Sequence, residues 1–132
     1  MKYKVGRSLQ KEDSKKYEET AEKIFKFYLD GFKIIFWGVN SPFYSLRENL
    51  IKLIKNKNLN DKFISVDTNE LKKKVAFHED IFLSPDQLFK YLNKSNQKHL
   101  FVITAYGYHK KIFSKIRRYN AIFYTYNSIA KN

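Results

Sequence analysis

The clearest indication of the fold is the segment Gly31-Phe32-Lys33-Ile34-Ile35-Phe36-Trp37-Gly38-Val39-Asn40-Ser41-Pro42. The nearly continuous apolar run over residues 32–37 is typical of a strand that is buried on both faces of a sheet. A tight turn follows, in which Ser41 is suited to cap a helix and Pro42 to occupy its first position. The stretch therefore predicts a buried strand, a turn and a helix over about residues 43–56.

The rest of the chain alternates in the same way. Further strands are predicted at residues 63–67, 99–105 and 121–126. Further helices are predicted at residues 14–29, 84–92 and 109–118, and Ser84 and Gln87 have the spacing of a capping box. The segment 68–81 predicts a short helix over residues 69–76 and then a loop. This alternation predicts an α/β fold with a parallel sheet of about four or five strands and helices on both faces.

The chain of 132 residues fits one domain that buries a core of its own. Residues 1–13 are charged and show no clear period, so we expect a flexible N-terminal arm, followed by an α/β domain over residues 14–132. The sequence has no cysteine, which excludes disulfides and thiolate metal sites. It also has no run of about 18 apolar residues, so no membrane contact is expected.

The composition is strongly basic, with 26 Lys and Arg against 13 Asp and Glu and a net charge of +13. Such a surface attracts polyanions, and nucleic acid is the usual partner. A biased genome is the alternative explanation, because Lys, Asn, Ile, Phe and Tyr have A/T-rich codons and make up half of the chain. Both explanations stay open at this point.

The turn Gly38, Asn40, Ser41 and Pro42 lies where a nucleotide hydrolase has its phosphate-binding loop. The first glycine is present, but the second glycine and the phosphate-binding lysine are absent. The strand at 99–105 is also followed by no carboxylate that could hold Mg²⁺. We therefore predict a degenerate phosphate-binding turn, no catalytic residues, no cofactor and no enzymatic activity.

Other candidate site residues are few. His78, His99 and His109 lie at no metal-ligand spacing, so no metal site is predicted. The basic residues near the C-terminal end are candidates for contacts to a DNA backbone: Lys110, Lys111, Lys115, Arg117 and Arg118. The alternative for this cluster is a solvated helix face.

The stretch from Gly31 to Ser41 resembles the signature of the second subunit of the eukaryotic origin recognition complex. That signature reads Gly-Phe, four hydrophobic positions and then Tyr-Gly-x-Gly-Ser-Lys. The helix before it, the strand over residues 100–104 and the strand over 121–126 also look like elements of that family. The sequence departs from the signature at Asn40, which replaces its second glycine, and at Pro42, which replaces its lysine.

The resemblance implies a P-loop NTPase or AAA+-like (RecA-like) core without its own ATPase activity, lacking the family's lid and winged helix. It also implies a nuclear scaffold for DNA replication initiation, which binds DNA and other subunits of the complex, especially the third. In such a sheet the first strand lies beside the fourth, and its other side would be open here. We therefore expect residues 32–37 to form an edge that a partner covers. Two alternatives are a basic nucleic-acid-binding module and a divergent nucleotide-binding α/β enzyme.

Overall fold

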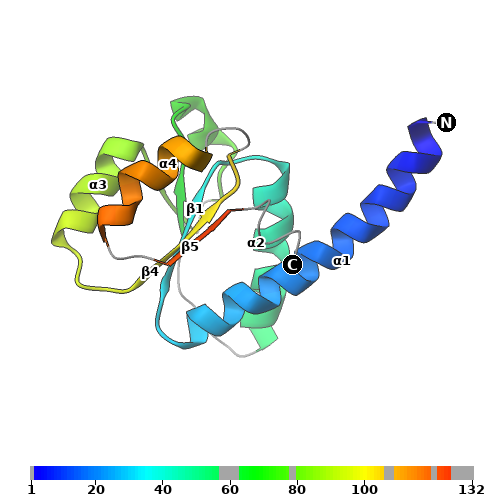
Figure 1. Ribbon diagram of the computed structural model, residues 1–132, viewed down its shortest axis with the longest axis horizontal. Coiled ribbons are helices and arrows are strands. Elements are labelled where there is room, and N and C mark those ends of the chain that lie inside the picture. The colour runs from blue at the N-terminus through cyan, green and yellow to red at the C-terminus, as the bar shows by residue number, and fades with distance from the viewer. Residues whose placement is uncertain (1, 57–62, 78–79, 106–108, 120–121, 126–132) are drawn as a thin grey trace.

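The structure is a computed structural model that describes residues 2–56, 63–77, 80–105, 109–119 and 122–125. Figure 1 shows helices on either side of a sheet, with one long helix extending beyond it. In chain order the elements are α1 (Lys2–Leu29), β1 (Lys33–Trp37), α2 (Ser41–Asn56), β2 (Ile64–Val66), the 3-10 helix η1 (Glu70–Lys74), β3 (Ile81–Leu83), α3 (Pro85–Lys94), β4 (His99–Ile103), α4 (His109–Ile116), the 3-10 helix η2 (Arg117–Tyr119) and β5 (Ile122–Thr125).

The described strands form one parallel sheet of five strands in the order β3-β2-β1-β4-β5. In its register, Ile35 of β1 lies opposite Ile64 of β2 on one side and Phe101 of β4 on the other. The α/β fold with a parallel sheet is therefore confirmed. The chain builds the sheet outward in one direction from β1 to β3 and then in the other direction from β4 to β5. This is the order of doubly wound sheets, whose direction of winding reverses beside β1.

The predicted position of the first strand is wrong. β1 is not an edge but the central strand, paired with β2 and β4. The AAA+-like order places the first strand beside residues 121–126, whereas here β4 lies between β1 and β5. The expectation that a partner covers an exposed β1 therefore has no basis in this sheet. Local hydrophobic pattern identifies a buried strand, but it does not say which strands are its neighbours.

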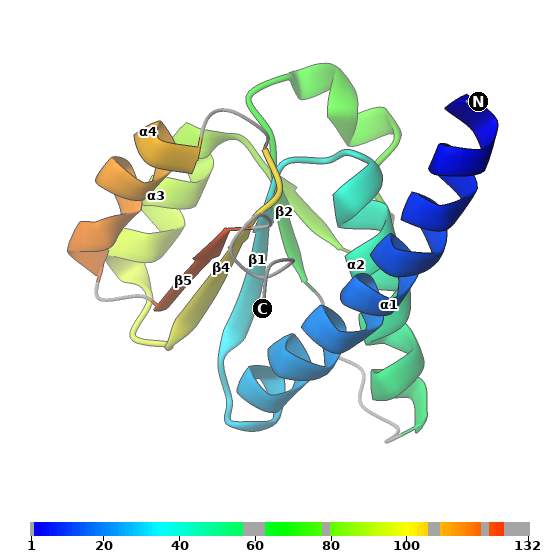
Figure 2. The ribbon, with the colours of Figure 1, turned by 45° about the vertical axis from the view of Figure 1, so that its right-hand side comes forward.

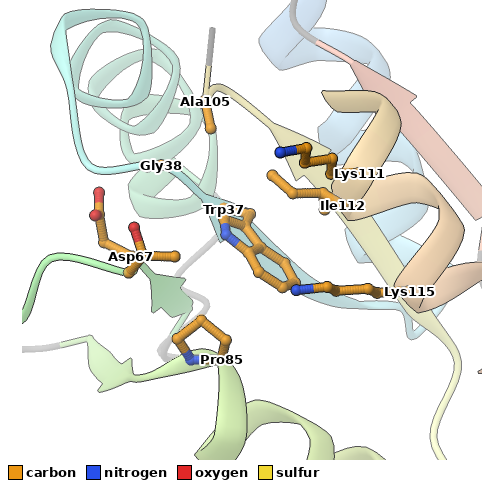
Figure 3. Close-up of a pocket in the computed structure, with 9 residues that line it drawn as sticks. Trp37, Gly38, Asp67, Pro85, Ala105, Lys111, Ile112 and Lys115 are labelled. Atoms are coloured by element: carbon orange, nitrogen blue, oxygen red, sulfur yellow. The ribbon is translucent and has the colours of Figure 1, made fainter. Parts of the chain in front are cut away.

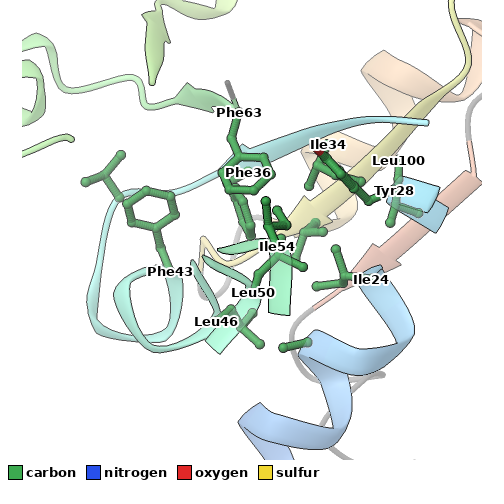
Figure 4. Close-up of a cluster of buried hydrophobic side chains, with 13 residues drawn as sticks. Ile24, Tyr28, Ile34, Phe36, Phe43, Leu46, Leu50, Ile54, Phe63 and Leu100 are labelled. Carbon is green, nitrogen blue, oxygen red and sulfur yellow. The ribbon is translucent and has the colours of Figure 1, made fainter. Parts of the chain in front are cut away.

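Helices cover both faces of the sheet, α1 and α2 on one face and α3 and α4 on the other (Figures 1 and 2). Successive residues of β1 divide between the two faces, because side chains alternate along a strand. Ile34 and Phe36 join the core under α1 and α2, which Figure 4 shows, and Ile35 and Trp37 join the core under α3 and α4. Burial on both faces explains why this strand has a continuous apolar sequence.

The first helix is longer than predicted. It begins at Lys2 and not at Ser14, so residues 2–13 are helical. Its C-terminal half packs on the sheet through Ala21, Ile24 and Tyr28, which are buried. Its N-terminal turns extend away from the sheet (Figure 2). Among the described residues, no helix combines the length and the apolar character needed to cross a membrane.

The segment over residues 68–83 differs most from the prediction. The expected helix over 69–76 is the shorter 3-10 helix η1, and the strand β3 was not predicted. Arg47 of α2 fixes this segment through a bidentate ion pair with Asp80, with N–O distances of 2.6 and 2.8 Å. The guanidinium also lies 3.6 Å from the ring centroid of Phe77. A contact from a distant helix thus holds a segment whose own sequence has little periodicity.

Candidate functional site

A pocket of about 350 Å³ opens at the carboxyl edge of the sheet, the edge at which the parallel strands end (Figure 3). It lies on the face that α3 and α4 cover, beside the place where the strand order reverses. We call it the carboxyl-edge pocket, and its lining residues are Trp37, Gly38, Asp67, Thr68, Pro85, Ala105, Lys111, Ile112 and Lys115. Ligands of doubly wound sheets bind at this position.

Three apolar side chains form the body of the carboxyl-edge pocket. Trp37, the last residue of β1, lies at its centre in Figure 3, with Pro85 of α3 and Ile112 of α4 around it. The Trp37 ring contacts the ring of Phe89, at a centroid distance of 6.1 Å. Apolar walls with a few fixed polar groups are the common composition of small-molecule sites.

Asp67 follows β2 directly and supplies the acidic side of the pocket. Its Oδ2 accepts a hydrogen bond from the backbone N–H of Val39 at 2.9 Å. Its Oδ1 accepts one from the backbone N–H of Asn69, also at 2.9 Å. Each carboxylate oxygen can accept a further bond, so Asp67 is held in place and still has acceptor capacity. Asp67 was not predicted as a site residue, although it is an acid at the end of the strand predicted over residues 63–67.

Lys111 and Lys115 supply the basic side, across Trp37 from Asp67 in Figure 3. They are four residues apart on α4 and therefore share one face of the helix. Ile112 and Ile116 anchor the helix by packing into the core under α3 and α4. Both lysines are exposed, and no ion pair or hydrogen bond to another described residue is present at either amine.

The structure separates the five predicted DNA contacts into two groups. Lys111 and Lys115 line the carboxyl-edge pocket, whereas Lys110, Arg117 and Arg118 do not, although all five are exposed. Arg118 lies against the neighbouring Tyr119 ring, at 5.0 Å from its centroid. A cluster that is continuous in sequence therefore presents its charges to different surroundings.

Gly38, the first glycine of the degenerate turn, is explained by packing. Its φ is +121°, and a Cβ there would lie 2.6 Å from the backbone N of Ala105 and 2.8 Å from Oγ1 of Thr104. The Thr104 hydroxyl donates to the carbonyl oxygen of Gly38 at 2.6 Å. The glycine is thus needed because the end of β4 approaches the end of β1 closely.

Asn40 makes several hydrogen bonds in the rest of this turn. Asn40, and not the predicted Ser41, caps α2, because its Oδ1 accepts from the N–H of Phe43 at 3.2 Å. The Asn40 side-chain amide also donates to the carbonyl oxygen of Thr104 at 2.7 Å. The N–H of Tyr44 bonds to the Asn40 carbonyl at 3.0 Å, and Pro42 has no N–H. The start of α2 therefore offers few donors to an anion.

His99, whose side chain the structure describes, does not line this pocket. His99 lies at the start of β4, with its Nε2 3.1 Å from the Tyr91 hydroxyl. Burial, with a contribution from the charge of Lys33, lowers the pKa of His99 below its ordinary value. His78 lies outside the described residues, as does the side chain of His109. In the part of the chain that the structure describes, no three acidic or histidine side chains are grouped as metal ligands.

Comparisons with protein-family models, with curated proteins and with solved structures each find no match. The strand order and the residues of the carboxyl-edge pocket therefore carry the functional interpretation. Together they combine an acid with spare acceptor capacity, two amines that bond to no other described residue, and an apolar centre. This set can bind a small molecule that has hydroxyl groups at one end and negative charge at the other.

Proposed function

We propose that this domain binds a small molecule with several hydroxyl groups, of the nucleoside or sugar type, in the carboxyl-edge pocket. The observation that supports the proposal is the position of Asp67, directly after β2 and on the lining of this pocket. In doubly wound sheets an acid near the end of the second strand accepts hydrogen bonds from ribose hydroxyls. Nucleotide binding was one of the alternatives predicted from the sequence. Here the binding site is the carboxyl-edge pocket and not the degenerate turn.

The fixed geometry of Asp67 supports this assignment. The N–H groups of Val39 and Asn69 hold the carboxylate from two different loops, so it is oriented before a ligand arrives. Preorganised acceptors lose little freedom on binding, which favours recognition of hydroxyl groups. Trp37 and Pro85 provide flat apolar surfaces for a base or a sugar ring.

The test is a nuclear magnetic resonance titration of the full chain with three neutral probes: adenosine, uridine and glucose. We expect at least one probe to shift signals of the pocket residues, and Asp67→Asn to weaken that probe about tenfold or more, as for loss of a bond to a charged acceptor. Glu70→Gln is the matched control, because Glu70 is an exposed acid outside this pocket.

Two outcomes contradict the proposal. In the first, none of the three probes, nor their phosphorylated forms, shifts the signals of the pocket residues. In the second, a probe binds equally well to the Asp67→Asn variant, which would remove the assigned role of this carboxylate.

A second candidate is binding of nucleic acid on α4 and η2. It is favoured by the exposure of all five predicted contacts, Lys110, Lys111, Lys115, Arg117 and Arg118. Phosphate contacts of this kind weaken steeply as salt is added. The replication-scaffold function, its nuclear location and its partner subunits stay hypotheses from the resemblance, and the strand order does not favour its AAA+-like core.

The two candidates separate by variant. Replacing Lys110, Arg117 and Arg118 with Ala leaves the carboxyl-edge pocket intact, because none of the three lines it. If nucleic acid is the ligand, this triple variant weakens binding to a DNA duplex and lowers its salt dependence. If the pocket is the site, the same variant binds the small-molecule probe as the parent does.

A further inference from the structure

We infer that the ligand of the carboxyl-edge pocket is a phosphate ester, and that Lys111 and Lys115 of α4 hold its phosphate group. This inference rests on the proposed function and adds the charged part of the ligand to it. It also moves the phosphate site of the doubly wound sheet from the turn after β1 to the helix after β4.

The usual phosphate-binding position of a doubly wound sheet is closed in this domain. Doubly wound sheets commonly bind phosphate on free N–H groups at the start of the helix after β1. Here the N–H groups of Phe43 and Tyr44 are bonded to Asn40, and Pro42 has none. Gly38 is filled by its neighbours, since Ala105 and Thr104 occupy the space that its missing Cβ leaves.

A pair of lysine amines on α4 supplies the positive charge that a phosphate needs. Lys111 and Lys115 lie one helical turn apart, and both line the pocket. A phosphate monoester carries a charge of about −1.5 to −2 at pH 7, against −1 for a carboxylate. Two cations that share no partner among the described residues match the phosphate charge better than the carboxylate charge.

The charges on the two sides of the pocket also set the orientation of the ligand. The carboxylate of Asp67 lies on the opposite side of Trp37 from the two amines (Figure 3). It repels a phosphate and attracts hydroxyl groups, so the two ends of the pocket fix the direction of the ligand. The phosphate then faces α4, and the sugar hydroxyls face the turn after β2.

Lys110 provides a comparison within the same helix. It is exposed, has the same charge and adjoins Lys111 in sequence, but it does not line the pocket. Any effect of general positive charge is therefore shared by Lys110→Gln. An effect of the site belongs to Lys111→Gln and Lys115→Gln alone.

The experiment measures affinity for three matched pairs: adenosine and AMP, uridine and UMP, glucose and glucose 1-phosphate. For the pair that binds, we expect the parent to prefer the phosphorylated member about tenfold or more. The double variant Lys111→Gln, Lys115→Gln should lose this preference, because its affinity for the phosphorylated member falls to that for the neutral member. Lys110→Gln should keep the preference, and unfolding midpoints of all three proteins confirm that they are folded.

Three outcomes overturn the inference and leave the proposed function standing. They are equal affinity of the parent for both members, a preference that survives in the double variant, and a preference that Lys110→Gln reduces by the same factor. Failure of the proposed function is distinct, because then no member of any pair binds in a way that depends on Asp67. In that case the phosphate site is overturned with it.

Discussion

Arg47 and Asp80 form one pair of charged side chains in this domain, Lys111 and Lys115 form another, and the two pairs differ in burial and in partners. The side chains of the first pair are 4% and 2% exposed, and their two hydrogen bonds join α2 to the segment before β3. The lysines are exposed at the rim of the carboxyl-edge pocket, with no described residue bonded to either amine. One pair holds the chain together, and the other is open to a ligand.

This contrast separates charged residues that maintain the fold from charged residues that are available to a ligand. A buried ion has lost its water and depends on its partner, so removal of the partner acts on stability. An exposed amine keeps its water, so its replacement changes stability little and changes what the surface attracts. The following predictions test this division, beginning with the largest effect.

Asp80→Ala should have the largest effect, because it leaves the buried Arg47 guanidinium without its carboxylate. We expect the free energy of unfolding to fall by about 3 to 5 kcal/mol, measured by urea denaturation. The double variant Arg47→Met, Asp80→Leu removes both charges and should lose less than Asp80→Ala alone. A double variant that is less stable than the single one would contradict this account of the pair.

Gly38→Ala should have the next largest effect, although this residue lines the pocket. The new Cβ meets the backbone of Ala105 at 2.6 Å, and φ is +121°. We expect a loss of about 2 to 4 kcal/mol from strain and overpacking. Gly31→Ala is the matched control, with φ +89° and nothing within 4 Å of the new Cβ, and should lose about 1 to 2 kcal/mol. Equal losses in denaturation would refute the close approach at Gly38.

His99 is a side chain that is buried without charge, and its effect on the free energy of unfolding should be smaller. Its pKa is lowered by burial and by Lys33, so between that pKa and about 6.5 the unfolded chain binds more protons than the folded one. The free energy of unfolding should therefore fall as the pH is lowered from about 7.5 to 5.5. His99→Gln should flatten this dependence in parallel thermal scans. An unchanged slope in the variant would assign the dependence to other groups.

Replacing both Lys111 and Lys115 with Ala should have the smallest effect on stability. Both are exposed and unpaired among the described residues, so the free energy of unfolding should change by no more than about 0.5 kcal/mol. A loss of 2 kcal/mol or more would place these lysines in the structure and remove the distinction between the two pairs.

Much of the fold could be predicted from local pattern. The apolar run of β1, the capping box of Ser84 and Gln87 and the basic helix α4 are all present. β3 was missed because it is a three-residue strand without clear alternation, and a long-range contact from Arg47 fixes the segment before it. The strand order was predicted wrongly, because the spacing of elements along the chain is similar in different sheet orders.

The site was predicted only in part, and for the same reason. Lys111 and Lys115 were identified by their charge. That they line the same pocket as Asp67 depends on the order of β2, β1 and β4 in the sheet. The glycine of the turn was interpreted as the remnant of a phosphate-binding loop. In the structure the approach of Thr104 explains it, and this is a contact across 66 positions of the chain.

The hydrogen bond from Val39 to Asp67 gives the pocket a spectroscopic reporter. The amide N–H of Val39 donates to Oδ2 of Asp67, a residue that lines the pocket, with an N–O distance of 2.9 Å. When a ligand hydroxyl donates to that carboxylate, electron density is drawn away from the bond to Val39, and its amide resonance moves. The nitrogen of a buried residue thereby registers occupancy of the pocket through one shared oxygen atom, without touching the ligand.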